Sequence, residues 1–459
     1  MAASSRHPMK KIHSLILILA AALTGAVTLF AKPAASPVRL EVDVDRHVLP
    51  AGAIERAIVK VSLHCLPPPR AQTRPPVNLA LVIDRSGSMQ GDRIEQAREA
   101  ALELVRRLGP DDIISLVAYD SEVEVLVPAQ RVRQARGLEA AIRGLTPRGM
   151  TALHGGVARG AEEVRKHIEH SGYVHRVILL SDGQANVGPR SPEELGRLGA
   201  ALLREGVSVT TVGLGLGFNE DLMTRLAQRS DGNTYFVEHS ADLPRIFTAE
   251  LGDVLNVVAR RVVIEVDFPA GVRPLRLVGR EGVINERRAE LTLNQIYGGQ
   301  ERFALIEVEV DPAKAGATRE IAQARVRYED VAGQRPATLT ASRSVKFSAD
   351  RAKVVASADH KVQADYAANL IAVAKDEAIA LVDAGRREDA GRLMSARVAE
   401  VNAMADTYRN AGLAKVAAPA AAEAERIARE GLDNAQRKLY RTESSQVRNQ
   451  QATAGEDRR

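Results

Sequence analysis

The alternation of apolar and polar positions changes its period several times along the chain, and each change marks a different kind of element. Between Val38 and Leu66, apolar residues recur at every second position, which predicts half-buried β-strands. Beyond residue 76, short apolar runs alternate with stretches whose apolar residues recur every three or four positions, which is typical of parallel strands covered by helices. Period two returns later in the chain, and a helical pattern with a break at Gly385 follows it.

These patterns predict an unusual order of parts. Two strands alone are only marginally stable, so we expect the early strands to join the later ones in one β-sandwich. The fold class is therefore α/β, with a doubly wound, mostly parallel sheet inserted in that sandwich and an α-helical hairpin behind it. The predicted parts are N-terminal strands at 38–66, a proline-rich linker at 67–76, the α/β domain at 77–255, the β-rich domain at 257–347, the helical hairpin at 360–440 and a polar, disordered tail at 441–459.

The first 32 residues have the pattern of an export signal. Lys10 and Lys11 precede an apolar run from Leu15 to Ala31 that contains no charged residue. Its length lies between that of a signal peptide and that of a membrane span, so cleavage and retention as an N-terminal anchor both remain open. We expect an exported protein, periplasmic or extracellular, with attachment to the inner membrane through this segment as the alternative.

Composition narrows the possible partners. The chain has 459 residues, 45% of them hydrophobic and only 3% aromatic, and it contains a single cysteine, Cys65, so no intrachain disulfide can form. Four of the 63 basic residues lie in the first 32 positions, where there is no acidic residue, which leaves 59 basic and 58 acidic residues beyond them. This balance gives no reason to expect nucleic-acid binding.

Side chains with oxygen donors follow the predicted strands of the α/β domain. Asp84, Ser86 and Ser88 come directly after the first strand, Thr151 precedes a helix, and Asp182 follows another strand. Parallel strands place such residues in a crevice at their carboxyl ends. Oxygen donors without nitrogen or sulfur select hard cations, so Mg²⁺ is predicted, with Mn²⁺ or Ca²⁺ as alternatives. The other interpretation is that these residues only cap helices.

Over residues 77–250 this arrangement resembles the von Willebrand factor type A (VWA) family, in particular its exported bacterial members. The resemblance implies a metal-ion-dependent adhesion site (MIDAS) in which the hydroxyls of Ser86, Ser88 and Thr151 bind the ion, while Asp84 and Asp182 hold metal-bound waters. With few charged groups touching it, such an ion keeps much of its positive charge and attracts an outside carboxylate. The implied function is metal-dependent binding, of the adhesion or receptor type, to a protein that presents Asp or Glu.

Four further residues are candidates for the rim of this site, namely Arg85, His154, Gln184 and Asn186. Each has a plainer interpretation. Arg85 is expected to be solvated rather than to contact a ligand, His154 to be a capping or surface residue in the first turn of a helix, and the two amides to shape the loop after Asp182.

We do not expect an enzyme. The chain has no phosphate-binding loop, no His-Glu-x-x-His and no Gly-x-Ser-x-Gly, and the glycines between Gly213 and Gly217 lack the dinucleotide-binding spacing. Two alternatives remain: an envelope assembly scaffold that docks through its helical C-terminal region, and a metal-dependent hydrolase. In some VWA relatives the last helix moves when ligand binds, which by analogy makes residues 243–251 a lever here.

Overall fold

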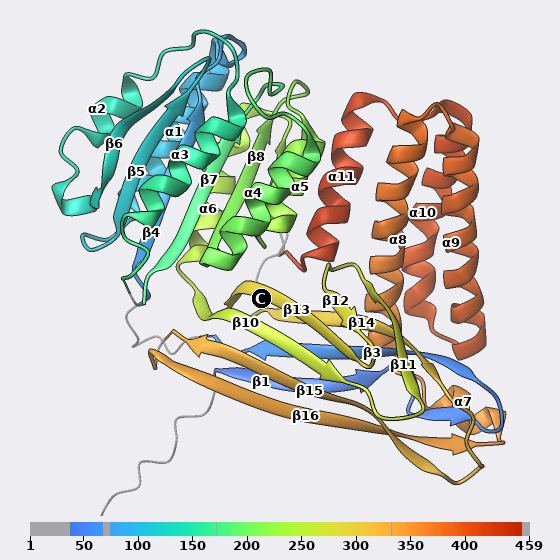
Figure 1. The fold of residues 1–459 in the computed structure, drawn as a ribbon. Helices are drawn as coiled ribbons and strands as arrows, with labels where there is room; N and C mark the ends of the chain where they lie inside the picture. The colour runs from blue at the N-terminus through green and yellow to red at the C-terminus, as the bar shows by residue number, and fades with distance from the viewer. Residues whose placement is uncertain (1–36, 68–73, 171, 332, 452–459) are drawn as a thin grey trace, which may run out of the picture. The chain divides into compact units, whose positions relative to one another are not determined.

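The fold is taken from a computed structural model that describes residues 37–67, 74–170, 172–331 and 333–451 (Figure 1). The predicted export segment at 1–32 and the last residues of the predicted tail, 452–459, lie outside the described residues. Within the described ranges, no helix has the length and apolar character needed to cross a membrane.

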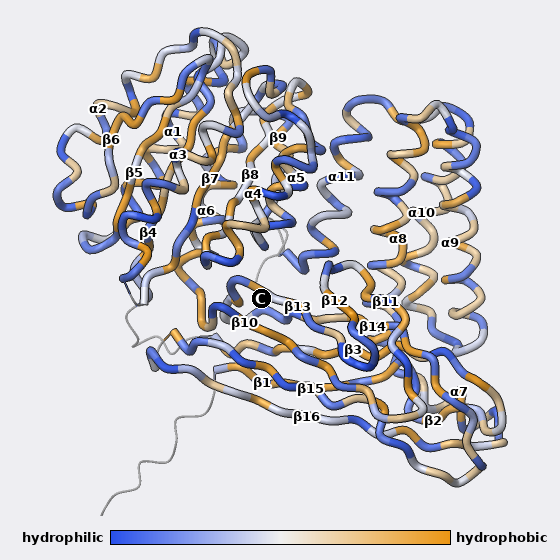
Figure 2. Tube along the Cα trace, viewed as in Figure 1, coloured by the Kyte–Doolittle hydropathy of each residue, from blue (hydrophilic) through white to orange (hydrophobic). Residues whose placement is uncertain are grey.

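The α/β domain is built on a six-stranded sheet with the order β6-β5-β4-β7-β8-β9 (Figure 1). Every neighbouring pair is parallel except β5 and the edge strand β6. The inner strands are buried along their whole length, because continuous apolar runs suit a sheet covered on both faces (Figure 2). The strands are β4 (Val77–Asp84), β5 (Ile113–Tyr119), β6 (Val123–Arg131), β7 (Val174–Ser181), β8 (Val207–Leu214) and β9 (Thr234–Val237).

Helices cover both faces of this sheet. Successive side chains of a strand point to opposite faces, so Leu81 packs in the core shared with α1 and α6, whereas Val82 packs in the core shared with α3, α4 and α5. The helices are α1 (Asp92–Arg106), α2 (Leu138–Arg143), α3 (Leu153–Arg165), α4 (Pro192–Glu205), α5 (Glu220–Arg229) and α6 (Leu243–Val254).

Strands that precede the α/β domain in the sequence and strands that follow it form a two-sheet sandwich, with the orders β1-β3-β14-β11 and β12-β13-β10-β15-β16-β2. Strand β3 pairs with β14 and β2 pairs with β16, so the early strands do join the later ones and the α/β domain is inserted between β3 and β10. The predicted fold class is confirmed. The strands are β1 (Val38–Val44), β2 (Val48–Pro50), β3 (Glu55–Cys65), β10 (Val257–Asp267), β11 (Val272–Val278), β12 (Val283–Asn285), β13 (Arg288–Tyr297), β14 (Glu301–Val310), β15 (Thr318–Asp330) and β16 (Arg335–Ser348).

The C-terminal region contains more helices than the hairpin predicted at 360–440. Gly385, with a φ of +75°, does form the turn between the first two long helices. Two further long helices follow, and all four share a core with Ile58, Phe303 and Leu305 of the sandwich sheet that contains β3 and β14. After the short α7 (Arg351–Ala356), the helices are α8 (His360–Asp383), α9 (Arg387–Tyr408), α10 (Ala411–Glu430) and α11 (Asn434–Arg448).

The disordered tail predicted at 441–459 is wrong for its first residues, because α11 continues to Arg448. Polar composition was misleading here, since several of these polar side chains are buried and hydrogen-bonded rather than solvated. Ser444 is 1% exposed, and its hydroxyl donates to the carbonyl of Ala372 at 2.8 Å. A capping box between Asp433 and Gln436 starts the helix.

Helix α11 also docks on the α/β domain. The buried ammonium group of Lys438 donates to the carbonyl oxygen of Phe218 at 2.6 Å and forms an ion pair with Glu220 at the start of α5. The amide of Gln451 accepts from the backbone N–H of Thr234 at 3.0 Å and donates to its carbonyl at 3.2 Å, so it pairs with the edge strand β9. The helical region and the inserted domain are therefore joined by direct contacts.

His175 lies buried near the junction of the α/β domain with the sandwich, with its Nδ1 3.1 Å from the amide nitrogen of Asn78. Burial, together with the positive charges of Arg260 and Arg261, lowers its pKa to about 4. The imidazole of His175 thus binds a proton more readily in the unfolded chain than in the folded one. The free energy of unfolding is therefore unaffected by this group above pH 6.5 and decreases as the pH falls toward 4.

We expect this loss to reach about 3 kcal/mol, measured by urea denaturation across that pH range. His175→Gln should flatten the pH profile, whereas the exposed control His239→Gln should leave it unchanged. An unaltered slope in His175→Gln would contradict the assignment.

Candidate metal centre

The five predicted ligand residues come together at one edge of the α/β sheet. Asp84 is the last residue of β4 and Asp182 directly follows β7, and these two strands are parallel neighbours, so their carboxyl ends meet. Ser86 and Ser88 follow in the loop after β4, and Thr151 lies just before α3. The crevice is thus where parallel strands are expected to place a ligand site.

Three hydroxyl oxygens surround one small space beside Gly183. A β-carbon built on this glycine would lie 3.1 Å from the Oγ1 of Thr151, 3.4 Å from the Oγ of Ser88 and 3.7 Å from the Oγ of Ser86. The two serine hydroxyls are 3.0 Å apart, and that of Ser88 donates to Oδ1 of Asp182 at 2.7 Å. The absent side chain of Gly183 therefore leaves a cradle lined by oxygen atoms.

The two carboxylates are buried close to this cradle. Asp84 accepts hydrogen bonds at its two oxygens from the backbone N–H of Ser86, at 2.8 Å, and from the hydroxyl of Ser181, at 2.6 Å. Burial raises the pKa of Asp84 to about 6, and the negative charge of Asp182 raises it too, while these hydrogen bonds act in the opposite direction. A cation between the two carboxylates would relieve both the burial cost and the repulsion.

The donor set fits a hard divalent cation. It consists of hydroxyl and carboxylate oxygens, which are the ligands that Mg²⁺, Mn²⁺ and Ca²⁺ prefer. In the part of the chain that the structure describes, no cluster of three or more His, Cys, Asp or Glu side chains is placed to hold a metal ion. A zinc or copper centre built from nitrogen and sulfur ligands thus has no counterpart there.

Arg93, in the first turn of α1, contacts the site and was not among the predicted residues. Its Nη1 donates to Oδ2 of Asp182 at 2.6 Å and to the backbone carbonyl of Ser88 at 3.0 Å. The Asp-x-Ser-x-Ser pattern does not extend to this position. The sequence gives one signal for it. Arg93 comes five residues after Ser88, and the first turn of a helix lies beside the loop that precedes the helix.

Arg85, predicted at the rim or in solvent, is in neither place. Its guanidinium is buried on the other side of the loop, where Nε donates to Asp120 at 2.7 Å and Nη2 to Glu124 at 2.9 Å. The reason is local, because neighbouring residues at a strand end point to opposite sides, and Asp84 already points into the crevice. A second arginine, Arg148, binds the same oxygen of Asp120 at 2.9 Å, which stabilises this carboxylate.

The other three rim candidates lie around the site and have structural partners. Asn186 accepts from the backbone N–H of Thr151 at 2.7 Å and so positions one of the hydroxyl residues. Gln184 donates to the carbonyl of Gly217 at 2.8 Å and connects two loops. His154 is half-buried on the first turn of α3, and this burial lowers its pKa.

Two exposed apolar side chains lie in loops that flank the cradle. Met150, between Gly149 and Thr151, is 53% exposed, and Leu216, beside Gly217, is 43% exposed. The loop of Leu216 reaches the site, since a β-carbon on Gly217 would come within 2.6 Å of the carbonyl oxygen of Asp182. The surroundings of the crevice therefore combine charge with apolar surface.

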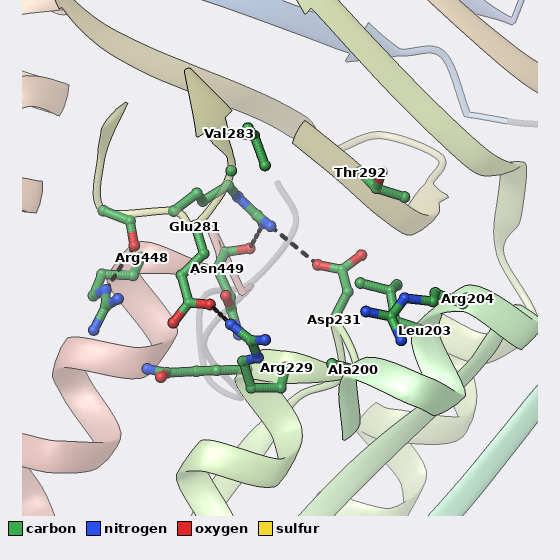
Figure 3. Close-up of a pocket in the computed structure, with 14 residues that line it drawn as sticks. Ala200, Leu203, Arg204, Arg229, Asp231, Glu281, Val283, Thr292, Arg448 and Asn449 are labelled. Carbon is green, nitrogen blue, oxygen red and sulfur yellow. Dashed lines mark hydrogen bonds and ion pairs between the residues drawn. The ribbon is translucent and has the colours of Figure 1, made fainter. Parts of the chain in front are cut away.

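A separate pocket of about 320 Å³ lies where α4 and α5, the turn between β11 and β12, and the end of α11 meet (Figure 3). Two of its arginines are paired with carboxylates that also line it. Arg280 donates to Asp231 at 3.0 Å, and Arg229 forms an ion pair with Glu281 (Figure 3). We interpret this pocket as part of the junction between the three regions.

Sequence comparison finds the family of the α/β domain. Residues 78–249 match the family model of the von Willebrand factor type A domain. The chain is 29% identical over 269 residues to an uncharacterized protein of Synechocystis, which covers 56% of this chain and 63% of that protein. It is also 29% identical over 204 residues to human inter-alpha-trypsin inhibitor heavy chain H3, covering 42% of this chain and 22% of that protein. The matched region thus spans less than two thirds of each relative.

Solved structures share the fold over a larger part of the chain. A von Willebrand factor type A protein from Catenulispora acidiphila has a TM-score of 0.63 at 18% identity, covering 80% of this chain and 88% of that one. The ArnB paralog VWA2 from Sulfolobus acidocaldarius has a TM-score of 0.61 at 17% identity, covering 90% and 98%. At these identities the likeness concerns the fold alone, and it extends beyond the α/β domain.

Proposed function

We propose that this chain, whose residues 78–249 form a von Willebrand factor type A domain, binds a partner protein through a divalent cation held in the crevice beside Gly183. The observation that carries the proposal is the cradle of three hydroxyl oxygens next to two buried carboxylates. In this arrangement Ser86, Ser88 and Thr151 would bind the ion directly, and Asp84 and Asp182 would hold its waters, with Mg²⁺ the first candidate.

The surroundings of the crevice support a protein ligand with a carboxylate. Neutral hydroxyls leave most of the ion's charge uncompensated, so an Asp or Glu from outside completes its coordination. Met150 and Leu216, exposed in the flanking loops, offer apolar contact to residues next to that carboxylate. A free anion would make no use of these two side chains, whereas a protein surface would.

We further propose that this binding takes place in the cell envelope or outside the cell. The support is in the sequence, where Lys10 and Lys11 precede the uncharged apolar run from Leu15 to Ala31. Cell fractionation followed by N-terminal sequencing of the mature protein distinguishes a cleaved signal from a retained anchor. Recovery of the intact chain in the cytoplasm would contradict the proposed location.

Calorimetry with Mg²⁺ and Mn²⁺ tests the metal site. We expect the wild type to bind one ion, and Asp84→Ala to weaken binding on the order of 100-fold, because the replacement removes the acceptor that orients Ser86 and the metal-bound water. The matched control is Asp111→Ala. Asp111 is an exposed aspartate that precedes β5, so it lies at the amino ends of the parallel strands, whereas the site lies at their carboxyl ends. An affinity that Asp84→Ala leaves unchanged would rule out this crevice.

Affinity capture tests the proposed ligand class. Envelope extract is passed over the immobilised full chain in Mg²⁺ and eluted with a chelator. Partners should be retained by the wild type and Asp111→Ala, released by the chelator and absent with Asp84→Ala. Retention that survives the chelator would show binding that does not use the metal.

A further inference from the structure

We propose that Arg93 is an internal counter-cation of the metal site, which holds Asp182 when no ion is bound and competes with the ion for it. The inference rests on the proposed function, because it describes how the same site is regulated. Its consequence is that Arg93 sets the metal concentration at which the site fills.

The contacts of Asp182 carry this inference. Its side chain is fully buried, and its two oxygens face different partners, with Oδ1 accepting from the hydroxyl of Ser88 at 2.7 Å and Oδ2 from Arg93 at 2.6 Å. In the described part of the chain, Arg93 is the cation paired with Asp182. One oxygen thus belongs to the hydroxyl cradle and the other to the guanidinium.

The two side chains of this ion pair, Asp182 and Arg93, differ in how freely they can move. The carboxylate of Asp182 follows β7 directly and is held by its burial, whereas the side chain of Arg93 is 41% exposed and lies at the rim. It rests on Gly215, where a β-carbon would be 3.4 Å from its Nη2. Because the guanidinium is partly exposed, it can move away from Asp182 into solvent.

Electrostatics makes the ion and the arginine competitors. Without any cation, the charges of Asp84 and Asp182 would face each other in a buried crevice, and a single guanidinium at Asp182 relieves part of this repulsion. A divalent ion in the cradle relieves it better, but it is repelled by the positive charge already there. Metal uptake therefore includes the cost of weakening the Arg93 ion pair.

Calorimetric titration of the full chain with Mg²⁺, repeated with Mn²⁺, tests the inference. We expect Arg93→Gln to bind Mg²⁺ roughly five-fold or more tightly than the wild type. Arg93→Lys, which keeps the charge but loses the planar fork, should fall between them. The matched control is Arg106→Gln on the same helix, which removes an exposed arginine paired with Glu103 and should leave the affinity unchanged.

Thermal denaturation gives a second readout. In the presence of a chelator, Arg93→Gln should melt at a lower temperature than the wild type, because the two carboxylates lose their counter-cation. Saturating Mg²⁺ should raise the melting temperature of Arg93→Gln by more than it raises that of the wild type. If Arg93→Gln binds Mg²⁺ as weakly as the wild type or more weakly, the inference is overturned. The proposed function would still stand in that case, provided that the wild type binds Mg²⁺ and Asp84→Ala does not. If the wild type binds no Mg²⁺, the proposed function fails and the inference fails with it.

Discussion

Gly183→Ala should strongly weaken the binding of a divalent cation while leaving the fold intact. The added methyl group would lie between 3.1 and 3.7 Å from the hydroxyl oxygens of Thr151, Ser88 and Ser86, in the space that the ion needs. We expect calorimetry to show Mg²⁺ affinity reduced on the order of 100-fold. Gly183 has no positive φ, so alanine imposes no backbone strain there, and the melting temperature in chelator should change by about 2 °C or less.

The control for this substitution is Gly252→Ala. This glycine lies in α6, where a β-carbon would meet no atom within 4 Å, so neither metal affinity nor stability should fall. If Gly183→Ala keeps wild-type affinity, the three hydroxyls do not surround the ion, and the ligand set would have to be reassigned.

The largest expected loss of stability comes from Glu250 of α6, which is 1% exposed. Its carboxylate accepts from the hydroxyl of Thr210 at 2.5 Å, from the amide of Asn233 at 2.8 Å and from the hydroxyl of Tyr235 at 3.1 Å, and lies 3.5 Å from Nε of Arg176. Glu250→Ala would leave the fully buried Arg176 without its counter-charge. We expect the free energy of unfolding to fall by about 3–5 kcal/mol in urea denaturation.

Glu205→Ala is the matched control, because Glu205 forms an exposed ion pair with Arg165 and should cost less than about 1 kcal/mol. A loss of similar size in both variants would mean that the buried network adds little. The network also bears on the lever that family resemblance suggested at 243–251. Since Glu250 ties α6 to β7, β8 and β9, any displacement of this helix must first break these contacts.

Much of the fold could be predicted because its strands and helices differ in period. Continuous apolar runs mark β4 and β7, which are covered on both faces, and alternation marks β1 and β10, which have one face in the sandwich core. The edge strand β6 has no such pattern, because among its side chains only that of Val127 is buried. A strand without a continuous apolar face carries no such signal.

The tail shows a different limit. Hydropathy alone cannot tell a polar residue in solvent from one whose partner lies far away in the sequence. Lys438 illustrates this, since its partners Phe218 and Glu220 lie more than 200 residues earlier. The predicted hairpin therefore ends at residue 440, whereas α11 continues to Arg448.

For the candidate site, the five ligand residues could be predicted because loops after neighbouring parallel strands must converge. Side-chain direction could not, as Arg85 and Arg93 show. The first stands next to a ligand residue in sequence and points away from the site, while the second lies five residues beyond Ser88 and points into it. Sequence proximity and spatial proximity diverge where a strand passes through a loop into a helix.

The insertion of the α/β domain has a mechanical consequence. The chain enters it at β4 and leaves it after α6, and a body held at two points can still rotate about the line between them. Helix α11 supplies a further attachment, where Lys438 donates to the carbonyl oxygen of Phe218 in the loop before α5, and Arg280 supplies another through Asp231. Such attachments restrict this rotation, so a pull on a bound ligand would be passed to the sandwich and to the helical region through side-chain contacts as well as along the chain.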